Sequence, residues 1–345
     1  MRWAEQTLES LLDRVAGAER DLGTRWPLYA DPISGAWSTT ARGSWTGGFW
    51  AGLLWLRAAA TGAPSDRAAA SRRTGMLRPW IGADTATRGL IFWYGTCFGD
   101  GDAAALRAEA ADACLAAHDP GLGVLPWGEA FGGPRELARV DGLPGLPRLL
   151  LSTGAEGDRA ARAHLDVQVG LTAATPDLVP AWRHEAGRWT AHPAPPAGWS
   201  RTVGWLLLAV AEGSPAQIRR CLDHPVVAAR LAAGADPVPP AGPPVQDASG
   251  TGAPVPPDTS AAAIEAVAAL KLAERVGGDE GGRLRERGVA VLRALAGRYV
   301  RHGRLIGGCY ELERGIATGH ELVWGDFFLA VGLAVLCGSV AVADF

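Results

Sequence analysis

Apolar residues recur at helical spacing along most of the chain. In residues 6–20, QTLESLLDRVAGAER, the leucines and the valine stand three or four positions apart, as on one face of a helix. Residues 103–119, 258–275 and 282–300 show the same kind of pattern, and glycine and proline separate the segments. The pattern predicts about ten to twelve helices and few strands, and therefore an all-α fold.

Two segments are apolar on nearly every side: residues 205–211, WLLLAVA, and residues 327–343, FFLAVGLAVLCGSVAVA. A helix of this kind has to be enclosed by other helices, as in an inner ring that an outer ring surrounds. The second segment approaches the length of a membrane span. Its glycines and Ser339, with Asp326 and Asp344 close by, favour a helix buried inside the protein over a membrane anchor.

One proline-rich stretch interrupts the helical pattern at residues 236–258, DPVPPAGPPVQDASGTGAPVPPD. Proline fixes φ and removes a backbone donor, so this stretch cannot be a helix. A loop of this length is usually either functional or disordered, and the sequence leaves both interpretations open. We expect residues 1–345 to form a single domain that carries this loop.

Composition and charge limit the kinds of molecule that we expect this protein to bind. A chain of 345 residues, 48% of them hydrophobic, can bury a large core. The net charge of −3 provides no basic face for nucleic acid or an anionic membrane, so we expect a small-molecule partner. The five cysteines are scattered without a C-x-x-C pair, which predicts neither a disulfide framework nor a metal site and fits the cytoplasm. Acidic residues in MRWAEQTLESLLDR argue against a signal peptide.

The tryptophans stand mostly at junctions between loops and helices, beside glycine or proline, whereas alanine, leucine and valine fill the helical core positions. An indole has an apolar face and one N–H donor, which suits stacking against a sugar or another cyclic ligand. Any one of these side chains could instead fill a gap between helices. Together they predict a tryptophan-lined cavity, and the junction residues are Trp45, Trp50, Trp127, Trp182, Trp189, Trp199 and Trp205.

Five segments resemble, in order, those of the unsaturated glucuronyl hydrolases of glycoside hydrolase family 88 and of the related family 105. The resemblance spans most of the chain and implies an (α/α)6 barrel, a toroid of six helical hairpins with its active site at one mouth. That fold agrees with the enclosed helices described above. The segments are WTGGFWAGLLWL (45–56), VDGLPGLPRLL (140–150), GWSRTVGW (198–205), DTSAAAIEAVAAL (258–270) and WGDFFLAVGLAVL (324–336).

The resemblance also implies a chemistry. An aspartic acid protonates C4 of the C4=C5 enol ether in an unsaturated uronic acid, water adds at C5, and the resulting hemiketal opens and releases the sugar. The segment ARVDGLPGL places Asp141 at the position of that acid. Val140, Leu143 and Leu146 would surround the carboxyl group with apolar side chains and favour its protonated form. Alternatively, Asp141 is the N-cap of a following helix.

At the second catalytic position the sequence departs from the family, whose members usually carry a His-Asp pair there. In GADTATRGLIFWYG, residues 82–95, alignment on GLIF puts Thr87 where the aspartate is expected, with no histidine beside it. Asp84, three residues upstream, is the alternative second acid. Trp93 in the same stretch is a further candidate for substrate contact.

Other family positions have also changed. Where a histidine is expected, VPAWRHEAGRW offers Trp182, with His184 two positions later. The segment WSRTVGW keeps Arg201 between Trp199 and Trp205, but the Gly-Gln that often follows the arginine has become Thr-Val. Polar groups that would hold a charged sugar are lost and aromatic groups remain, so we expect poor turnover of standard unsaturated glucuronyl disaccharides.

Two acidic features are candidates for structural roles. Asp258, together with Thr259, is expected to cap a helix at the mouth of the cavity, with substrate contact as the alternative. Glu311 and Glu313 in CYELERG are expected to lie in solvated loops or at helix ends.

Three functions follow as alternatives, none with a metal or cofactor. The first is a diverged hydrolase that protonates an enol ether. The second is a repurposed barrel of secondary metabolism, in which Asp141 drives isomerisation or cyclisation and aromatic faces stabilise cationic charge. The third is a catalytically silent binding protein, against which the presence of Asp141, Trp199, Arg201 and Trp205 argues. The oligomeric state is left open.

Overall fold

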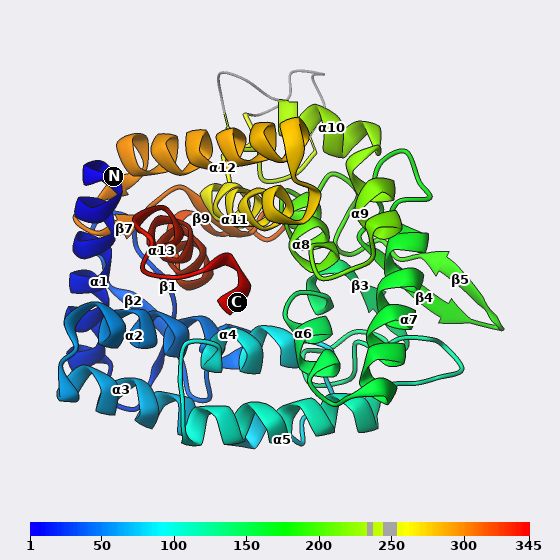
Figure 1. Cartoon of the computed structure of the whole chain (residues 1–345), viewed down its shortest axis with the longest axis horizontal. Helices are drawn as coiled ribbons and strands as arrows, with labels where there is room; N and C mark the ends of the chain where they lie inside the picture. Colours follow the sequence, from blue (N-terminus) through cyan, green and yellow to red (C-terminus); the bar gives the residue numbers. More distant parts are fainter. Residues whose placement is uncertain (233–236, 244–253) are drawn as a thin grey trace.

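The helices form two concentric rings, as Figure 1 shows. The computed structural model describes residues 1–232, 237–243 and 254–345. The inner ring contains α2, α4, α6, α8, α11 and α13, while α1, α3, α5, α7, α9, α10 and α12 surround it. The predicted (α/α)6 barrel is confirmed. The helices are α1 (Arg2–Leu22), α2 (Gly47–Thr61), α3 (Pro64–Gly75), α4 (Tyr94–Thr96), α5 (Asp102–Ala117), α6 (Leu146–Leu151), α7 (Ala155–Thr172), α8 (Arg201–Val210), α9 (Pro215–Leu222), α10 (Pro225–Ala232), α11 (Thr259–Val276), α12 (Gly278–Arg298) and α13 (Val323–Cys337).

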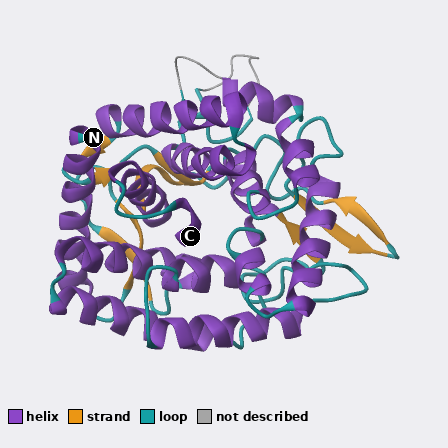
Figure 2. Cartoon of the chain, viewed as in Figure 1, coloured by secondary structure: helices purple, strands orange, loops and turns teal. Residues whose placement is uncertain are grey.

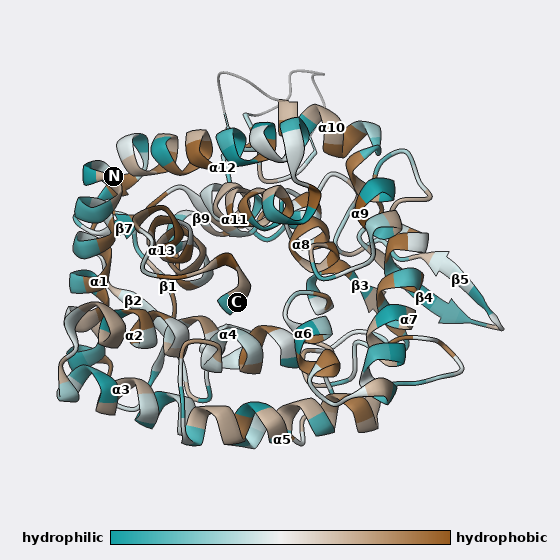
Figure 3. Ribbon diagram, viewed as in Figure 1, coloured by the Kyte–Doolittle hydropathy of each residue, from teal (hydrophilic) through white to brown (hydrophobic). Residues whose placement is uncertain are grey.

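Inner helices are enclosed on all sides, whereas outer helices bury one face. Every residue of α8 is buried, and so are residues 259–272 of α11 and 323–334 of α13. Figure 3 shows α13 as almost uniformly hydrophobic, while α12 alternates between hydrophilic and hydrophobic residues. The prediction that the C-terminal apolar segment is a buried helix is confirmed. Within residues 1–232, 237–243 and 254–345, no helix has both the length and the apolarity to cross a bilayer.

Glycines in α2 allow the backbone of this helix to touch the next inner element directly. That element is the π-helical turn η3 (Gly89–Trp93), which leads into α4. A Cβ atom at Gly48 would lie 2.3 Å from the carbonyl oxygens of Leu90 and Ile91, which is far inside van der Waals contact. Gly48 therefore lets the backbones of two inner elements pack directly against each other.

Short strands supplement the helices, and Figure 2 shows them in orange. They form a four-stranded sheet in the order β2-β1-β9-β8, a three-stranded sheet in the order β3-β4-β5 and a two-stranded sheet of β6 and β7. Strands of this length carry little alternating signal, and sequence analysis located none of them. The strands are β1 (Trp26–Ala30), β2 (Trp37–Thr40), β3 (Leu137–Arg139), β4 (Ala181–Glu185), β5 (Arg188–Ala191), β6 (Val300–Arg301), β7 (Arg304–Leu305), β8 (Gly308–Glu311) and β9 (Ile316–Leu322).

The predicted proline-rich loop is described in part. Residue 236 and residues 244–253 lie outside the described residues. In the described arms, Pro240 and Pro257 form an antiparallel bridge, and the Ala241 amide donates to the carbonyl of Pro256 at 2.8 Å. This part of the loop is non-helical, as predicted, and residues 241–243 lie at the cavity described next.

Candidate active site

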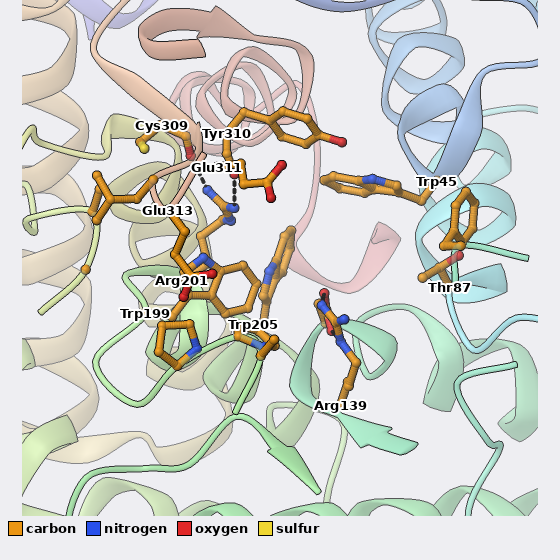
Figure 4. Close-up of a pocket in the computed structure, with 18 of the residues that line it drawn as sticks. Trp45, Thr87, Arg139, Trp199, Arg201, Trp205, Cys309, Tyr310, Glu311 and Glu313 are labelled. Atoms are coloured by element: carbon orange, nitrogen blue, oxygen red, sulfur yellow. Dashed lines mark hydrogen bonds and ion pairs between the residues drawn. The ribbon is translucent and has the colours of Figure 1, made fainter. Parts of the chain in front are cut away.

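A cavity of about 880 Å³ opens at one mouth of the barrel. Its walls come from segments far apart in the sequence, including the turn before α2, the start of α8 and strand β8, as Figure 4 shows. Of the predicted site residues, the structure brings seven together here, and four of them are tryptophans. These seven are Trp45, Thr87, Trp127, Asp141, Trp199, Arg201 and Trp205.

Asp141 forms a bidentate ion pair with Arg139, a residue that sequence analysis missed. The guanidinium donates from Nε to Oδ1 at 3.0 Å and from Nη2 to Oδ2 at 2.6 Å. It also lies over the ring of Trp127, with Cζ 3.9 Å from the ring centroid. Both carboxylate oxygens thus accept charge-assisted hydrogen bonds from a single cation.

Local backbone structure explains this pair. Strand β3 ends at Arg139 and continues into the 3₁₀ turn η4 (Val140–Gly142), and pairing of Arg139 with Ala181 fixes its register on β4. Arg139 is extended and Asp141 lies within the turn, so the pair forms across the point where the strand ends. The only sequence signal for the pair was an arginine two positions before the aspartate in ARVDG.

The surroundings of Asp141 differ from the predicted ones. Val140, Leu143 and Leu146 are fully buried, as expected, but the Asp141 side chain is 16% exposed and faces a cation. The alternative interpretation as a helix cap is wrong. Helix α6 begins at Leu146, its N-cap is Gly145, and no side chain caps it.

A second ion pair, between Arg201 and Asp258, lies beneath the opposite wall. Arg201 donates from Nη1 to Asp258 Oδ2 at 2.9 Å and from Nη2 to the carbonyl of Tyr310 at 2.9 Å. It also donates to the carbonyl of Cys309, and its guanidinium lies over the ring of Trp199, with Cζ 4.7 Å from the centroid. The arginine therefore has partners on several sides.

Asp258 is the N-cap of α11, as predicted, because its Oδ1 accepts from the backbone amide of Ser260 at 3.1 Å. The hydroxyl groups of Ser200 and Ser260 donate to it at 2.7 and 2.6 Å. Its fractional exposure is 0%. The alternative of direct substrate contact is therefore wrong, because no part of the carboxylate reaches the cavity.

At the second family position, Thr87 lines the cavity and Asp84 does not. The Thr87 hydroxyl lies 2.9 Å from the hydroxyl of Thr85. The Asp84 carboxylate instead accepts from Arg135 Nε at 2.9 Å, and its side chain is 41% exposed. The structure thus does not bring Asp84 into the cavity as a second acid, because this partner holds it outside.

Four further predicted residues also lie elsewhere. Trp50 is buried and donates to Glu19 at 2.9 Å, so it fills the gap between α2 and α1. Trp93 lines a separate cavity. Trp182 and His184 belong to β4, and the β4–β5 hairpin projects from the barrel (Figure 1). Their spacing in the sequence identified these residues as junction or family positions. It did not reveal the direction in which each side chain points.

Glu311 and Glu313 lie at the cavity, a position that sequence analysis did not foresee. Both line it on the side of Arg201, where Glu311 points toward Trp45 and Glu313 lies near Trp199 (Figure 4). Glu311 ends strand β8, and its side chain is 37% exposed. Glu313 lies in the exposed turn after β8, as expected of a solvated loop, whereas Glu311 ends a strand, and pairing of β8 with β9 carries this segment to the mouth of the barrel.

Comparison with known proteins shows the fold. No family model matches the chain, and no curated protein matches it. Among solved structures, an unsaturated glucuronyl hydrolase from Bacillus sp. GL1, responsible for the degradation of glycosaminoglycan, has a TM-score of 0.83 at 22% identity, covering 96% of each chain. One specific for heparin has a TM-score of 0.83 at 19% identity, covering 98% of each chain.

A further unsaturated glucuronyl hydrolase, from Streptococcus agalactiae, has a TM-score of 0.80 at 19% identity, covering 97% of this chain and 91% of that one. The structural neighbours are thus unsaturated glucuronyl hydrolases. At these identities the likeness establishes the architecture, and it extends over nearly the whole chain.

Proposed function

We propose that this chain is an enzyme of the unsaturated glucuronyl hydrolase type, diverged in substrate, that protonates an electron-rich C=C bond with Asp141. The observation that carries this proposal is the position of Asp141 at an aromatic cavity in a barrel of this architecture. The other aspartate of the site, Asp258, is fully buried and has no access to a ligand. The resemblance of five sequence segments to this family supports the same conclusion.

The proposed reaction consumes one water and regenerates the acid. Protonated Asp141 gives its proton to C4 of the enol ether, and the π electrons of C4=C5 form the new C–H bond. The ring oxygen shares the positive charge that develops at C5, and the ring of Trp205, which lines the cavity, can stabilise it. Water then attacks C5 and returns a proton to the Asp141 carboxylate. The hemiketal opens by breaking the bond between C5 and the ring oxygen, which leaves a ketone at C5 and a hemiacetal at C1. That hemiacetal then expels the second sugar as an alcohol and becomes an aldehyde.

Arg139 acts here as a positioning residue. Among the described residues its guanidinium donates to Asp141 alone, and it stacks on Trp127. Each Asp141 oxygen that accepts from this guanidinium keeps a second lone pair that can take up the proton. The pair therefore holds the carboxylate toward the cavity between turnovers.

A panel of unsaturated disaccharides with uronate, neutral or amine-bearing sugars tests the proposal, with mass spectrometry of the products as the readout. Hydration followed by cleavage yields two monosaccharides whose summed mass exceeds that of the substrate by one water. We expect such products from at least one substrate. Products with the same mass as the substrate would indicate isomerisation instead of hydration. If no member of the panel is turned over, the result would favour the binding-protein alternative.

A further inference from the structure

The cations at the cavity already have anionic partners. Arg139 and Arg201 are the arginines among its described lining residues. Both Arg139 contacts go to Asp141, and Arg201, which is 5% exposed, is held by Asp258 and by two backbone carbonyls. Each guanidinium is already paired with a carboxylate, so its positive charge is largely neutralised before an anionic ligand arrives.

Glu311 and Glu313 carry the charge that is not neutralised. The Glu311 carboxylate lies 3.5 Å from Arg314, but that arginine is 71% exposed, so the contact is weak. Glu313 forms no ion pair with any residue that the structure describes. The described lining thus carries three carboxylates, the two glutamates and Asp141, against the two guanidiniums, and the buried Asp258 adds a fourth carboxylate beneath it.

Aromatic rings lie next to the Glu311 carboxylate. Figure 4 shows Tyr310 and Trp45 on either side of the space that Glu311 faces. The face of an aromatic ring attracts a cation, and a carboxylate beside it adds charge complementarity. Trp199 contributes less, because Arg201 already lies over its ring.

We propose that this cavity selects a substrate carrying an ammonium group, such as an amino sugar, over one carrying a uronate, and that Glu311 and Glu313 determine this specificity. The inference rests on the proposed function, because it takes this cavity as the active site and names its substrate class. The amine would lie on the sugar next to the reacting ring, between Glu311 and Glu313 and beside Tyr310.

Binding of three disaccharides tests this inference, measured by isothermal titration at a pH where sugar amines are protonated. The probes are the chitosan disaccharide with free amines, its N-acetylated counterpart and the unsaturated hyaluronan disaccharide. We expect the free amine to bind roughly tenfold or more tightly than the acetylated form, and the uronate most weakly. Added salt should reduce the preference, because exposed charges are screened.

Variants that remove the charge of each glutamate test whether Glu311 and Glu313 cause the preference for the free amine. Glu311→Gln and Glu313→Gln should each reduce the ratio of the affinities, and the double variant should bring it close to one. Glu185→Gln is the matched control, because it removes the same charge from the end of β4, away from the cavity, and should leave the ratio unchanged. Both cavity glutamates are partly exposed, so the variants should fold.

Three outcomes would overturn the inference: tighter binding of the uronate, an unchanged ratio in the double variant, or no binding of any probe. Because these measurements need no turnover, they separate this inference from the proposed function. A confirmed amine preference without hydration of any unsaturated glycoside would contradict the proposed reaction alone. Hydration with a preference for uronate would contradict this inference alone.

Discussion

Two arginine–aspartate pairs lie at the same cavity and differ in their surroundings. In the pair of Arg201 and Asp258 the side chains are 6% and 0% exposed, and both residues have several further partners. In the pair of Arg139 and Asp141 they are 20% and 16% exposed, and within the described residues the two side chains hydrogen-bond only to each other. The same two residue types therefore form a structural pair in one place and an accessible pair in the other.

The number of partners accounts for the difference. The buried pair joins α8, the N-terminus of α11 and strand β8, so any movement of either residue would break several hydrogen bonds at once. The accessible pair lies on one strand and the turn that follows it. Separating Arg139 from Asp141 would break no further side-chain hydrogen bonds among the described residues. A group that transfers a proton has to be able to move in this way.

Truncation of Asp258 should have the largest effect on stability. Asp258→Ala leaves Arg201 buried without its carboxylate and removes the cap of α11, so we expect a loss of about 3–5 kcal/mol in the free energy of unfolding. Asp141→Ala, the matched change in the accessible pair, should cost about 1 kcal/mol or less. Denaturant unfolding of both variants measures this, and equal losses would show that the two pairs do not differ.

A third pair of an arginine and a carboxylate, Arg230 with Glu265, is also buried, and it extends the comparison to the pH dependence of stability. Burial raises the pKa of Glu265 from 4.5 to about 7, despite hydrogen bonds from Arg230 Nε at 2.8 and 3.1 Å. The folded state thus binds this proton more tightly than the unfolded state. The associated stability is fully present below pH 4.5 and is lost as the pH rises to about 7.

The expected loss across this range is on the order of 3 kcal/mol. Glu265→Gln should remove this pH dependence, as measured by thermal unfolding at a series of pH values. An unchanged dependence in the variant would mean that Glu265 is ionised at the same pH in the folded and unfolded states.

Substitution of Arg139 should affect turnover more than stability. Arg139→Gln removes the bidentate contact that holds Asp141 toward the cavity, so we expect kcat to fall about tenfold with little change in KM. Arg139→Lys should restore part of the loss. A loss of stability as large as the one expected for Asp258→Ala would instead identify the accessible pair as structural.

Asp84 should contribute least. Asp84→Asn removes a surface ion pair with Arg135 outside the cavity, so turnover should change less than about twofold. Steady-state kinetics measure the effect. A tenfold or larger decrease would show that Asp84 reaches the substrate after all.

The sequence predicted features that depend on one segment at a time. Segments apolar on all sides correctly indicated the inner helices α8 and α13, because a helix without a polar face has to be enclosed. Proline correctly excluded a helix in the described arms of the long loop. The short strands were missed because so few residues show no clear period.

Asp141 was predicted because residue type and family position agreed, Thr87 from its family position alone, and Trp127 from its place at a junction between a loop and a helix. Contacts between distant segments could not be read from spacing. Arg201 and Asp258 are 57 positions apart, and strand pairing rather than local sequence brings Glu311 to the cavity. Closeness in the sequence can also mislead. Trp50 is five residues from Trp45, which lines the cavity, but its indole faces α1.

The central claim is that Asp141 is the proton donor and that its pair with Arg139 is not a structural one. The most direct test is the rate at which Asp141→Asn turns over a substrate that the unmodified protein hydrates. Asparagine keeps the shape of the side chain but cannot supply the proton. We predict a loss of about a hundredfold or more, with unfolding and ligand binding close to those of the unmodified protein. Turnover near that of the unmodified protein would contradict the account.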